Sequence, residues 1–162
     1  MNKNNVSNFV NLSATELRNI EQVQGWAAAY SVPGGSATQL VDAYYSEAPE
    51  VISVLTDTHV ARKGLSKKAW RDAELRTHKL VTSRRIVFAA LHACGDVVTV
   101  EGRIEQLLKD GTKRGWPFAA VLFFDASGRI ERDHTYMLPP PHQREFELAA
   151  ELLSSADDRQ RG

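Results

Sequence analysis

Val97-Val-Thr-Val-Glu-Gly-Arg-Ile-Glu-Gln-Leu-Leu108 is one of several long runs rich in β-branched and aromatic residues between Arg84 and Met137. Such runs are typical of β-strands. Short turn signals separate them: Gly95-Asp96, Lys109-Asp110-Gly111 and Asp125-Ala-Ser-Gly128. The last run, Gly128-Arg-Ile-Glu-Arg-Asp-His-Thr-Tyr-Met137, places an acid and a histidine side by side. We therefore expect an antiparallel sheet of long strands.

Helical patterns precede this region. Ser13-Ala-Thr-Glu16 is a capping box, and apolar residues recur at helical spacing from Leu17 to Tyr30. Val32-Pro-Gly-Gly35 ends this helix. Ser36 opens a shorter helix that stops before Pro49.

The middle and the end of the chain contain three more predicted elements. Val51 to Val60 predicts a first strand or a hairpin, and Ser66 caps a helix whose predicted inner face is Ala69, Trp70 and Ala73. Pro139-Pro-Pro141 ends the sheet, because proline cannot donate to a β-ladder. A final helix is expected over residues 146–153.

The order of the elements predicts the α+β class, because helices and strands are segregated along the chain. A strand as long as 97–108 must twist or curl in a small sheet, and Gly102 is the expected bend site. A curled antiparallel sheet closed by N-terminal helices makes a cone with a pocket inside. We expect one domain over 13–153, a loose arm over 1–12 and a charged tail over 154–162.

Composition narrows the classes of partner and the compartment. The chain has 20 basic and 20 acidic residues, so it lacks the electrostatic signature of a nucleic-acid-binding protein. No window approaches the ~20 apolar residues of a membrane-spanning helix, and the first residues lack the apolar core of a signal peptide. With a single cysteine, Cys94, the chain is expected to be cytoplasmic.

Three segments resemble the SnoaL-like proteins of the nuclear transport factor 2-like superfamily. They are Gly25-Trp-Ala-Ala-Ala-Tyr30, Tyr44-Tyr-Ser-Glu-Ala-Pro-Glu-Val51 and Gly128-Arg-Ile-Glu-Arg-Asp-His-Thr-Tyr136. The resemblance implies a cone-shaped, cystatin-like α+β barrel that forms a homodimer through the outer face of its sheet. It also implies an apolar pocket. Members of the group include steroid isomerases, polyketide cyclases, dehydratases, epoxide hydrolases and non-catalytic binding domains.

Two charged residues of the long strand have alternative interpretations. Thr99, Glu101, Arg103 and Glu105 share one strand face, which strand geometry alone would leave in solvent. The resemblance instead points Glu101 and Arg103 into the pocket. There Glu101 would move a proton and Arg103 would stabilise negative charge. The sequence leaves both interpretations open.

Asp133 is the main catalytic candidate. The resemblance places Asp133 and Thr135 inside the pocket and His134 outside it, at a dimer surface. A carboxyl group in an apolar pocket has a raised pKa, which suits an acid or base near neutral pH. A one-residue shift of register would exchange the roles of Asp133 and His134.

Aromatic and small apolar residues make up the predicted ligand-binding wall. Besides Thr135, the candidates are Trp26, Tyr30, Tyr44, Trp70, Trp116, Ala119, Val121 and Phe123. Such residues are more often core filling than ligand contacts. Whether Trp116 and Phe118 or Pro117 and Ala119 face the pocket is left open.

The site is expected to need no metal and no organic cofactor. The five histidines show no metal-binding spacing, and no dinucleotide or phosphate-loop fingerprint occurs. Epoxide hydrolases of the group use an Asp-Arg-Asp arrangement with a water-holding Tyr and Asn. Here the corresponding positions carry Glu101, Arg103 and Thr135, with Ile52 and Val54 in place of the water-holding pair.

These observations lead to two main hypotheses. The first is a cofactor-independent isomerase or lyase, of cyclase or dehydratase type, that uses Asp133, Glu101 and Arg103 on a small apolar oxygenated molecule. The second is a non-catalytic dimeric domain that binds a hydrophobic ligand or acts as an interaction module. Epoxide hydrolysis is the third and least favoured alternative.

Overall fold

The computed structural model describes residues 12–55, 58–62 and 66–137. Several predicted segments lie outside the described residues: the helix over 146–153, the tail over 154–162 and nearly all of the arm over 1–12. The sheet-ending prolines at 139–141 lie outside them as well.

Three helices form where serine caps predict them. They are α1 (Ala14–Tyr30), α2 (Ala37–Tyr44) and α3 (Lys67–Leu80), preceded by Ser13, Ser36 and Ser66. Each serine hydroxyl accepts a hydrogen bond from the third backbone N–H of its helix. At α1 the Glu16 carboxylate also accepts from the Ser13 backbone N–H at 2.7 Å, so the capping-box prediction is confirmed.

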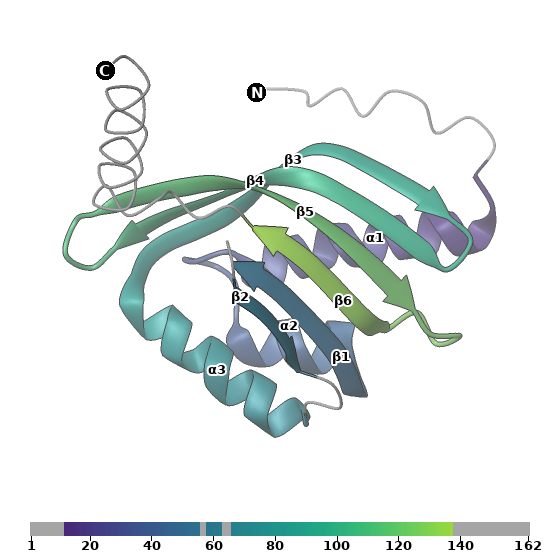
Figure 1. Ribbon diagram of the computed structural model, residues 1–162, viewed down its shortest axis with the longest axis horizontal. Coiled ribbons are helices and arrows are strands. Elements are labelled where there is room, and N and C mark those ends of the chain that lie inside the picture. The colour runs from purple at the N-terminus through teal and green to yellow at the C-terminus, as the bar shows by residue number, and fades with distance from the viewer. Residues whose placement is uncertain (1–11, 56–57, 63–65, 138–162) are drawn as a thin grey trace, which may run out of the picture.

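The strands form one six-stranded sheet in the order β2-β1-β6-β5-β4-β3 (Figure 1). The bounds are β1 (Tyr45–Leu55), β2 (Thr58–Arg62), β3 (Val81–Cys94), β4 (Val97–Leu108), β5 (Lys113–Phe124) and β6 (Ile130–Met137). The stretch predicted as one long strand, 97–108, is β4. Helix α1 packs against β3 and β4, and α2 packs against α3. The α+β prediction with a curved sheet and N-terminal helices is confirmed.

Two details of the sheet differ from the prediction. Strand β1 pairs with β2 as a hairpin but runs parallel to β6, with Val51 opposite Asp133. The all-antiparallel expectation is therefore wrong for this pair. The chain reaches β6 only after β2, α3 and three further strands, and such a long connection permits parallel pairing. Among the described strands, β2 and β3 are the two edges and do not pair, so the sheet is curved but open.

Strand β3 has a bulge where it passes Gly102 of β4. The register of this pair shifts between Phe88 and Ala90, which lie opposite Gly102 and Glu101, so one extra β3 residue forms a bulge. A Cβ atom on Gly102 would lie 2.6 Å from the Val87 carbonyl oxygen and 2.9 Å from the Phe118 ring. Only glycine therefore fits at this position without a shift of its neighbours. Gly102 is also the residue at which the sequence predicts a bend.

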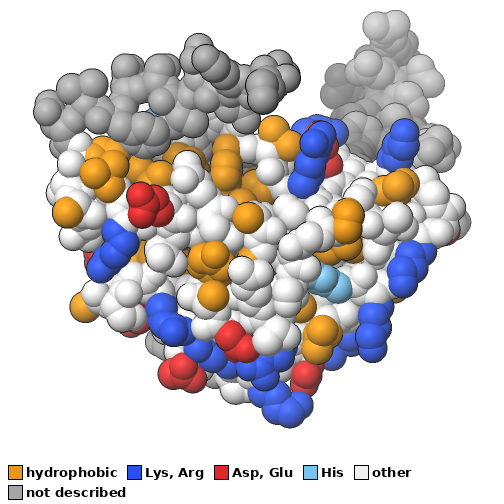
Figure 2. Space-filling view, turned by 180° about the vertical axis from the view of Figure 1, so that it is seen from behind, with side chains coloured by type: hydrophobic (Ala, Val, Ile, Leu, Met, Phe, Trp, Pro, Cys, Tyr) orange, Lys and Arg blue, Asp and Glu red, His pale blue; other side chains and the backbone are white. Residues whose placement is uncertain are grey.

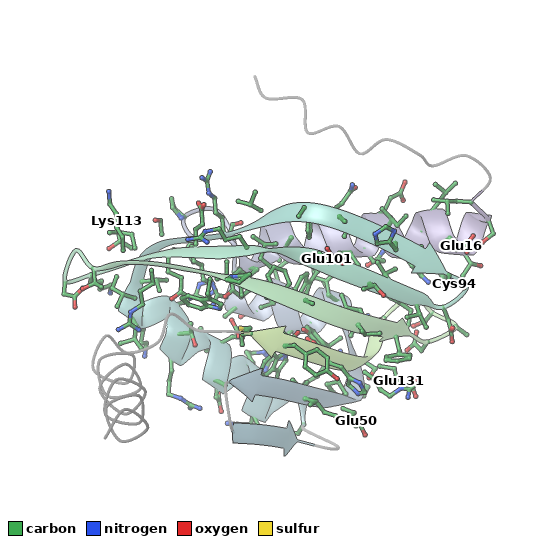
Figure 3. The ribbon with its side chains drawn as sticks, turned by 45° about the horizontal axis from the view of Figure 1, so that its top comes forward. Glu16, Glu50, Cys94, Glu101, Lys113 and Glu131 are labelled. Carbon is green, nitrogen blue, oxygen red and sulfur yellow. The ribbon has the colours of Figure 1, made fainter. Side chains whose placement is uncertain are left out.

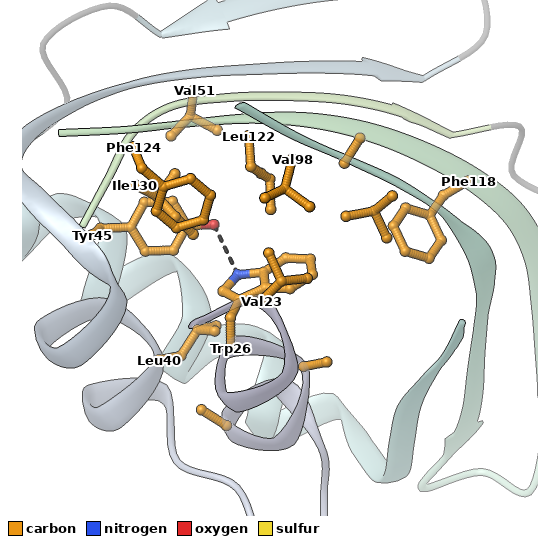
Figure 4. Close-up of a cluster of buried hydrophobic side chains, with 14 of the residues drawn as sticks. Val23, Trp26, Leu40, Tyr45, Val51, Val98, Phe118, Leu122, Phe124 and Ile130 are labelled. Carbon is orange, nitrogen blue, oxygen red and sulfur yellow. Dashed lines mark hydrogen bonds between the residues drawn. The ribbon is translucent and has the colours of Figure 1, made fainter. Parts of the chain in front are cut away.

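The main core lies between the concave face of the sheet and α1. Figure 4 shows the strands arching over Val23 and Trp26 of α1, with Leu40, Tyr45 and the inner residues of β4–β6 around them. Val98, Val100, Ala120, Leu122 and Ile130 are fully buried. These residues alternate with outward-facing neighbours along their strands. The alternation therefore determines which side chains lie on the concave face, where a ligand could contact them.

Helix α3 presents only part of the inner face predicted for it. Ala69 is exposed, and Trp70 and Ala73 are only partly buried. The one buried residue of α3 is Glu74, which lies one turn beyond Trp70 on the same side. The prediction is therefore correct for Trp70, which packs against the core, and wrong for Ala69. Apolar spacing could not identify the most buried position, because a charged residue occupies it.

The surface is mixed in character. In Figure 2 apolar side chains are scattered over the visible face in small groups, and lysines and arginines gather toward its lower edge. No helix in the described part of the chain is long and apolar enough to cross a membrane.

We predict that Gly102→Ala destabilises the protein by about 1–3 kcal/mol, because the added methyl group must displace the backbone of β3 or the Phe118 ring. Urea unfolding measures the change. The matched control is Glu101→Ala on the exposed side of the same strand, which should stay within about 0.5 kcal/mol of the wild type. Equal stability of Gly102→Ala and the wild type would contradict the close approach.

Candidate functional site

A cavity of about 230 Å³ lies between the concave face of the sheet and helices α1 and α3. Its wall is mainly aromatic and aliphatic. The polar groups that interrupt it are Tyr45, Glu74, Thr77, Arg84, Gln106, Asp133 and Thr135. A mostly apolar cavity with a few converging polar groups is the usual form of a small-molecule site.

Asp133 is the central polar group of this wall. It lies in β6 between β1 and β5, opposite Val51 and Leu122, and is 4% exposed. Tyr45 Oη donates a hydrogen bond to Asp133 Oδ2 at 2.6 Å, and Thr135 Oγ1 donates to Oδ1 at 2.6 Å. No lysine or arginine among the described residues forms an ion pair with Asp133. Its carboxyl group is therefore held by two neutral hydroxyls.

Tyr45 connects Asp133 to the first helix. It is the first residue of β1, directly after α2, and is 1% exposed. Trp26 Nε1 donates a hydrogen bond to Tyr45 Oη at 3.1 Å, drawn as a dashed line in Figure 4. The chain of hydrogen bonds from Trp26 through Tyr45 to Asp133 joins α1, β1 and β6, and it fixes the orientation of the carboxyl group.

Burial sets the protonation of this pair. Loss of solvation raises the pKa of Asp133 above its ordinary value, and the hydrogen bonds from Thr135 and Tyr45 offset part of this rise. Burial and the negative charge of Asp133 raise the pKa of Tyr45 well above its ordinary value. Both shifts start from very different ordinary pKa values, 3.8 for the carboxyl group and 10.0 for the phenol, so Asp133 is the more acidic group of this pair and Tyr45 keeps the proton that it donates in the hydrogen bond.

A second carboxylate, Glu74, lines the same cavity in a different environment. Arg84 Nη2 donates to Glu74 Oε2 at 2.6 Å, and the side chains of Arg84 and Glu74 are 1% and 10% exposed. Arg84 Nε donates to the backbone oxygen of Tyr30 at 2.6 Å, and the guanidinium lies 3.7 Å from the centre of the Tyr30 ring. Glu74 is therefore neutralised by a buried arginine that Tyr30 holds in place.

His78 completes this ion-pair network. Its Nε2 lies 2.9 Å from Arg84 Nη2. Partial burial and the positive charge of Arg84 lower the pKa of His78 below its ordinary value. A neutral imidazole can accept the hydrogen bond that Arg84 offers.

Two tryptophans of the cavity wall carry unsatisfied donors. Trp70 Nε1 and Trp116 Nε1 are buried and have no hydrogen-bond acceptor among the described residues. Trp70 also packs edge-on against Tyr45, with ring centres 5.8 Å apart. A buried donor without a partner costs free energy.

The structure brings together about half of the site residues predicted from the sequence. Asp133, Thr135, Trp26, Tyr30, Trp70 and Trp116 all line the cavity. His134 faces the other side of the sheet, where its Nε2 lies 3.2 Å from Glu50 Oε1 and its ring packs against Phe123. The register prediction for β6, with Asp133 inward and His134 outward, agrees with this placement.

Glu101 and Arg103 do not reach the cavity. Both are exposed on the outer face of β4, where Figure 3 labels Glu101, while Val100 and Ile104 occupy the inner face. The expected inward orientation is wrong, and the solvated interpretation of this strand face is correct. Charged residues that alternate with fully buried valines must lie on the opposite face of the strand.

Three residues of β5 are also on the other face. Phe118, Ala120, Leu122 and Phe124 are buried inside, so Ala119, Val121 and Phe123 lie outside the cavity. Both faces of this strand are apolar, and periodicity therefore could not separate them. Tyr44 is outside as well, because its ring packs over Gly25 of α1, where a Cβ atom would lie 2.4 Å from Tyr44 Oη.

Tyr45, Glu74 and Arg84 are the functional candidates that sequence reasoning missed. Tyr45 is not among the ligand-binding candidates named from the sequence, yet it lies buried beside Asp133. Glu74 and Arg84 are ten residues apart in a polar helix and the strand that follows it, and nothing in their spacing distinguishes them from surface residues. No group of three His, Cys, Asp or Glu side chains in the described part of the chain is arranged to hold a metal ion.

Comparison with known proteins places this geometry in a fold family. No family model and no curated protein matches the sequence. Solved structures do match the fold. An NTF2-like protein from Anabaena variabilis has 12% identity and a TM-score of 0.64, covering 82% of this chain and 97% of its own. The chain has the nuclear transport factor 2-like fold.

Two further structures with this fold extend the comparison. A protein with a ketosteroid isomerase-like fold from Catenulispora acidiphila, solved in complex with trimethylamine, is 20% identical with a TM-score of 0.60. The aligned region covers 73% of this chain and 85% of the Catenulispora acidiphila protein. A SnoaL-like protein from Jannaschia sp. CCS1 is 12% identical with a TM-score of 0.61, over 79% and 90% of the two chains. At these identities the likeness shows the fold and not the activity.

We predict that Glu74→Gln destabilises the protein by about 3 kcal/mol, because it leaves the buried Arg84 guanidinium without its counter-charge. Urea unfolding at neutral pH measures the loss. The control on the same helix is Asp72→Asn, which removes the exposed Lys68–Asp72 pair and should have a much smaller effect. A loss no larger than that of the control would argue against the buried pair.

We predict that Asp133→Asn becomes more stable relative to the wild type as the pH rises. The raised pKa means that folded Asp133 holds its proton more tightly than the unfolded chain does. The wild type therefore loses stability from about the ordinary value of 3.8 up to the folded pKa, whereas asparagine does not titrate. Urea unfolding between acid and neutral pH measures the divergence. The control is Asp96→Asn at an exposed turn, and an equal divergence there would contradict the assignment.

Proposed function

We propose that the cavity is the active site of a cofactor-independent acid–base enzyme, of isomerase or lyase type, that acts on a small apolar oxygenated molecule. One observation carries this proposal. Asp133 is buried in the wall of an apolar cavity and is held by two hydroxyl groups with no cationic partner among the described residues. A carboxyl group in this environment can take a proton from a substrate carbon and return it elsewhere.

The hydroxyl partners suit this role. Tyr45 and Thr135 donate to different oxygens of Asp133, so the carboxyl plane has a defined orientation when a substrate arrives. The same bonds stabilise the ionised carboxylate and prevent burial from raising the pKa of Asp133 further. Trp26 holds Tyr45 in turn, which makes it a positioning residue.

The cavity supports a small substrate with few polar atoms. Its volume of about 230 Å³ is below the roughly 300–1,000 Å³ of sites for drug-sized ligands. Glu101 and Arg103 have no part in this proposal, since both lie on the outer face.

A non-catalytic ligand-binding domain is the second candidate. The specific observation in its favour is that Glu74, the other carboxylate of the cavity, is neutralised by Arg84. A cavity with one neutralised carboxylate and one protonated carboxyl group would bind an apolar ligand without turnover. Epoxide hydrolysis is not favoured. Glu101 and Arg103 occupy positions where epoxide hydrolases of the group carry catalytic charges, and in this structure both residues face away from the cavity.

We also propose that the protein forms a homodimer and is cytoplasmic. Ala119, Val121 and Phe123 on the outer face of β5 are only partly buried, which supports a homodimer through this face of the sheet. A single, exposed cysteine is consistent with a reducing cytoplasm.

We predict that Asp133→Asn reduces proton transfer at least about 100-fold, because asparagine cannot accept the proton. The measurement is deuterium uptake from D2O at the carbon next to the carbonyl in a panel of small cyclic and aromatic ketones, followed by NMR. Glu101→Gln on the outer face is the matched control and should leave the rate unchanged.

Two outcomes separate the candidates. Undiminished exchange in Asp133→Asn would remove Asp133 from the mechanism. If the wild type binds members of the panel, as measured by quenching of tryptophan fluorescence, but exchanges none of them, the non-catalytic candidate is favoured.

A further inference from the structure

A second and larger hollow lies beside the end of the sheet that carries the β4–β5 hairpin. It has a volume of about 750 Å³ and is bordered by β3, β4, β5 and the turn after α1. Lys113, labelled in Figure 3, marks this end of the sheet, and Cys94 marks the opposite end. Asp133 does not line this hollow, so the proposed acid–base chemistry does not use it.

The hollow is strongly basic. Five cationic side chains line it against a single carboxylate, Glu105, although the whole chain has equal numbers of basic and acidic residues. The cationic residues are Arg84, Arg85, Arg103, Lys113 and Arg114. Arg84 is already neutralised by Glu74, which leaves four cations facing one acid. Clustered charge of one sign in a concave surface raises the local concentration of counter-ions.

Arg103 has a defined orientation in this hollow. Its Nη2 donates to the Gly115 carbonyl oxygen of the neighbouring strand at 3.1 Å. A Cβ atom on Gly115 would lie 2.7 Å from the same Nη2 and 3.2 Å from the guanidinium carbon. The glycine thus leaves the space that this guanidinium occupies. The arginine is oriented before any ligand arrives, which reduces the entropy cost of binding.

Glu105 organises the cluster without cancelling its charge. Arg85 Nε donates to Glu105 Oε2 at 2.7 Å, and Arg103 Nε lies 4.0 Å from Oε1. One carboxylate between two guanidiniums leaves an excess of positive charge. Lys113 and Arg114 add to this excess from the exposed start of β5.

We propose that this hollow is a binding site for a small anion, a carboxylate or a phosphate group, with Arg103 as its main contact. A guanidinium fork matches both groups in shape and charge. The anion site stands on its own observations and does not depend on the chemistry proposed for Asp133.

The test is titration of the whole protein with inorganic phosphate and, separately, with butyrate, at constant ionic strength set with potassium chloride. Isothermal calorimetry measures affinity, and the chemical shift of the Gly115 backbone amide reports whether the anion binds at this place. We expect saturable binding of at least one anion, with the tighter one giving the ligand class.

Four variants make the test specific. Arg103→Gln should weaken binding about tenfold or more, and Gly115→Ala should weaken it by displacing the guanidinium. Lys68→Gln removes an exposed cation of α3 and should leave the affinity unchanged. Asp133→Asn should also bind the anion normally, so a failure of the acid–base proposal is distinguishable from a failure of this one.

The proposal is overturned if neither anion binds saturably at constant ionic strength. It is also overturned if Lys68→Gln weakens binding as much as Arg103→Gln, since the effect would then reflect net charge alone.

Discussion

The close approach of β3 and β4 at Gly102 is the constraint on which the rest of this structure depends. A side chain at this position would collide with the Val87 carbonyl oxygen and with Phe118, and the adjacent bulge adds one residue to β3. Together they let two long strands bend over α1. Without this curvature the inner faces of β4, β5 and β6 would form a flatter sheet, which could not enclose a cavity above the helix.

The wall of the enclosed cavity contains two buried carboxylates with different partners. Glu74 is paired with Arg84, and an ion pair in a buried site is stable only because both charges are present. Asp133 has two hydroxyl partners instead, so loss of solvation raises its pKa. One carboxylate thus has a buried cationic partner and the other has only neutral hydroxyl partners, although both line the same cavity.

The elements could be predicted from the sequence because their signals are local. Serine hydroxyls at positions 13, 36 and 66 mark the three helix starts, and glycines with positive φ angles lie in the turns between β3, β4, β5 and β6. The inward direction of Asp133 could be anticipated only through a family resemblance. The same resemblance misdirected Glu101 and Arg103, whose neighbours Val98 and Val100 already indicated the buried face of that strand.

The sequence by itself determined the α+β class, the starts of the helices and the extent of β4, because capping, periodicity and turn chemistry act between residues close in the chain. Only the tertiary structure decided which face of β5 is buried, that β1 runs parallel to β6, and that Tyr45, Thr135 and Asp133 meet. These contacts join residues up to 88 positions apart, and their partners are selected by the curvature of the sheet and not by local pattern. The Arg84–Glu74 pair and the basic hollow around Arg103 depend on the same long-range packing.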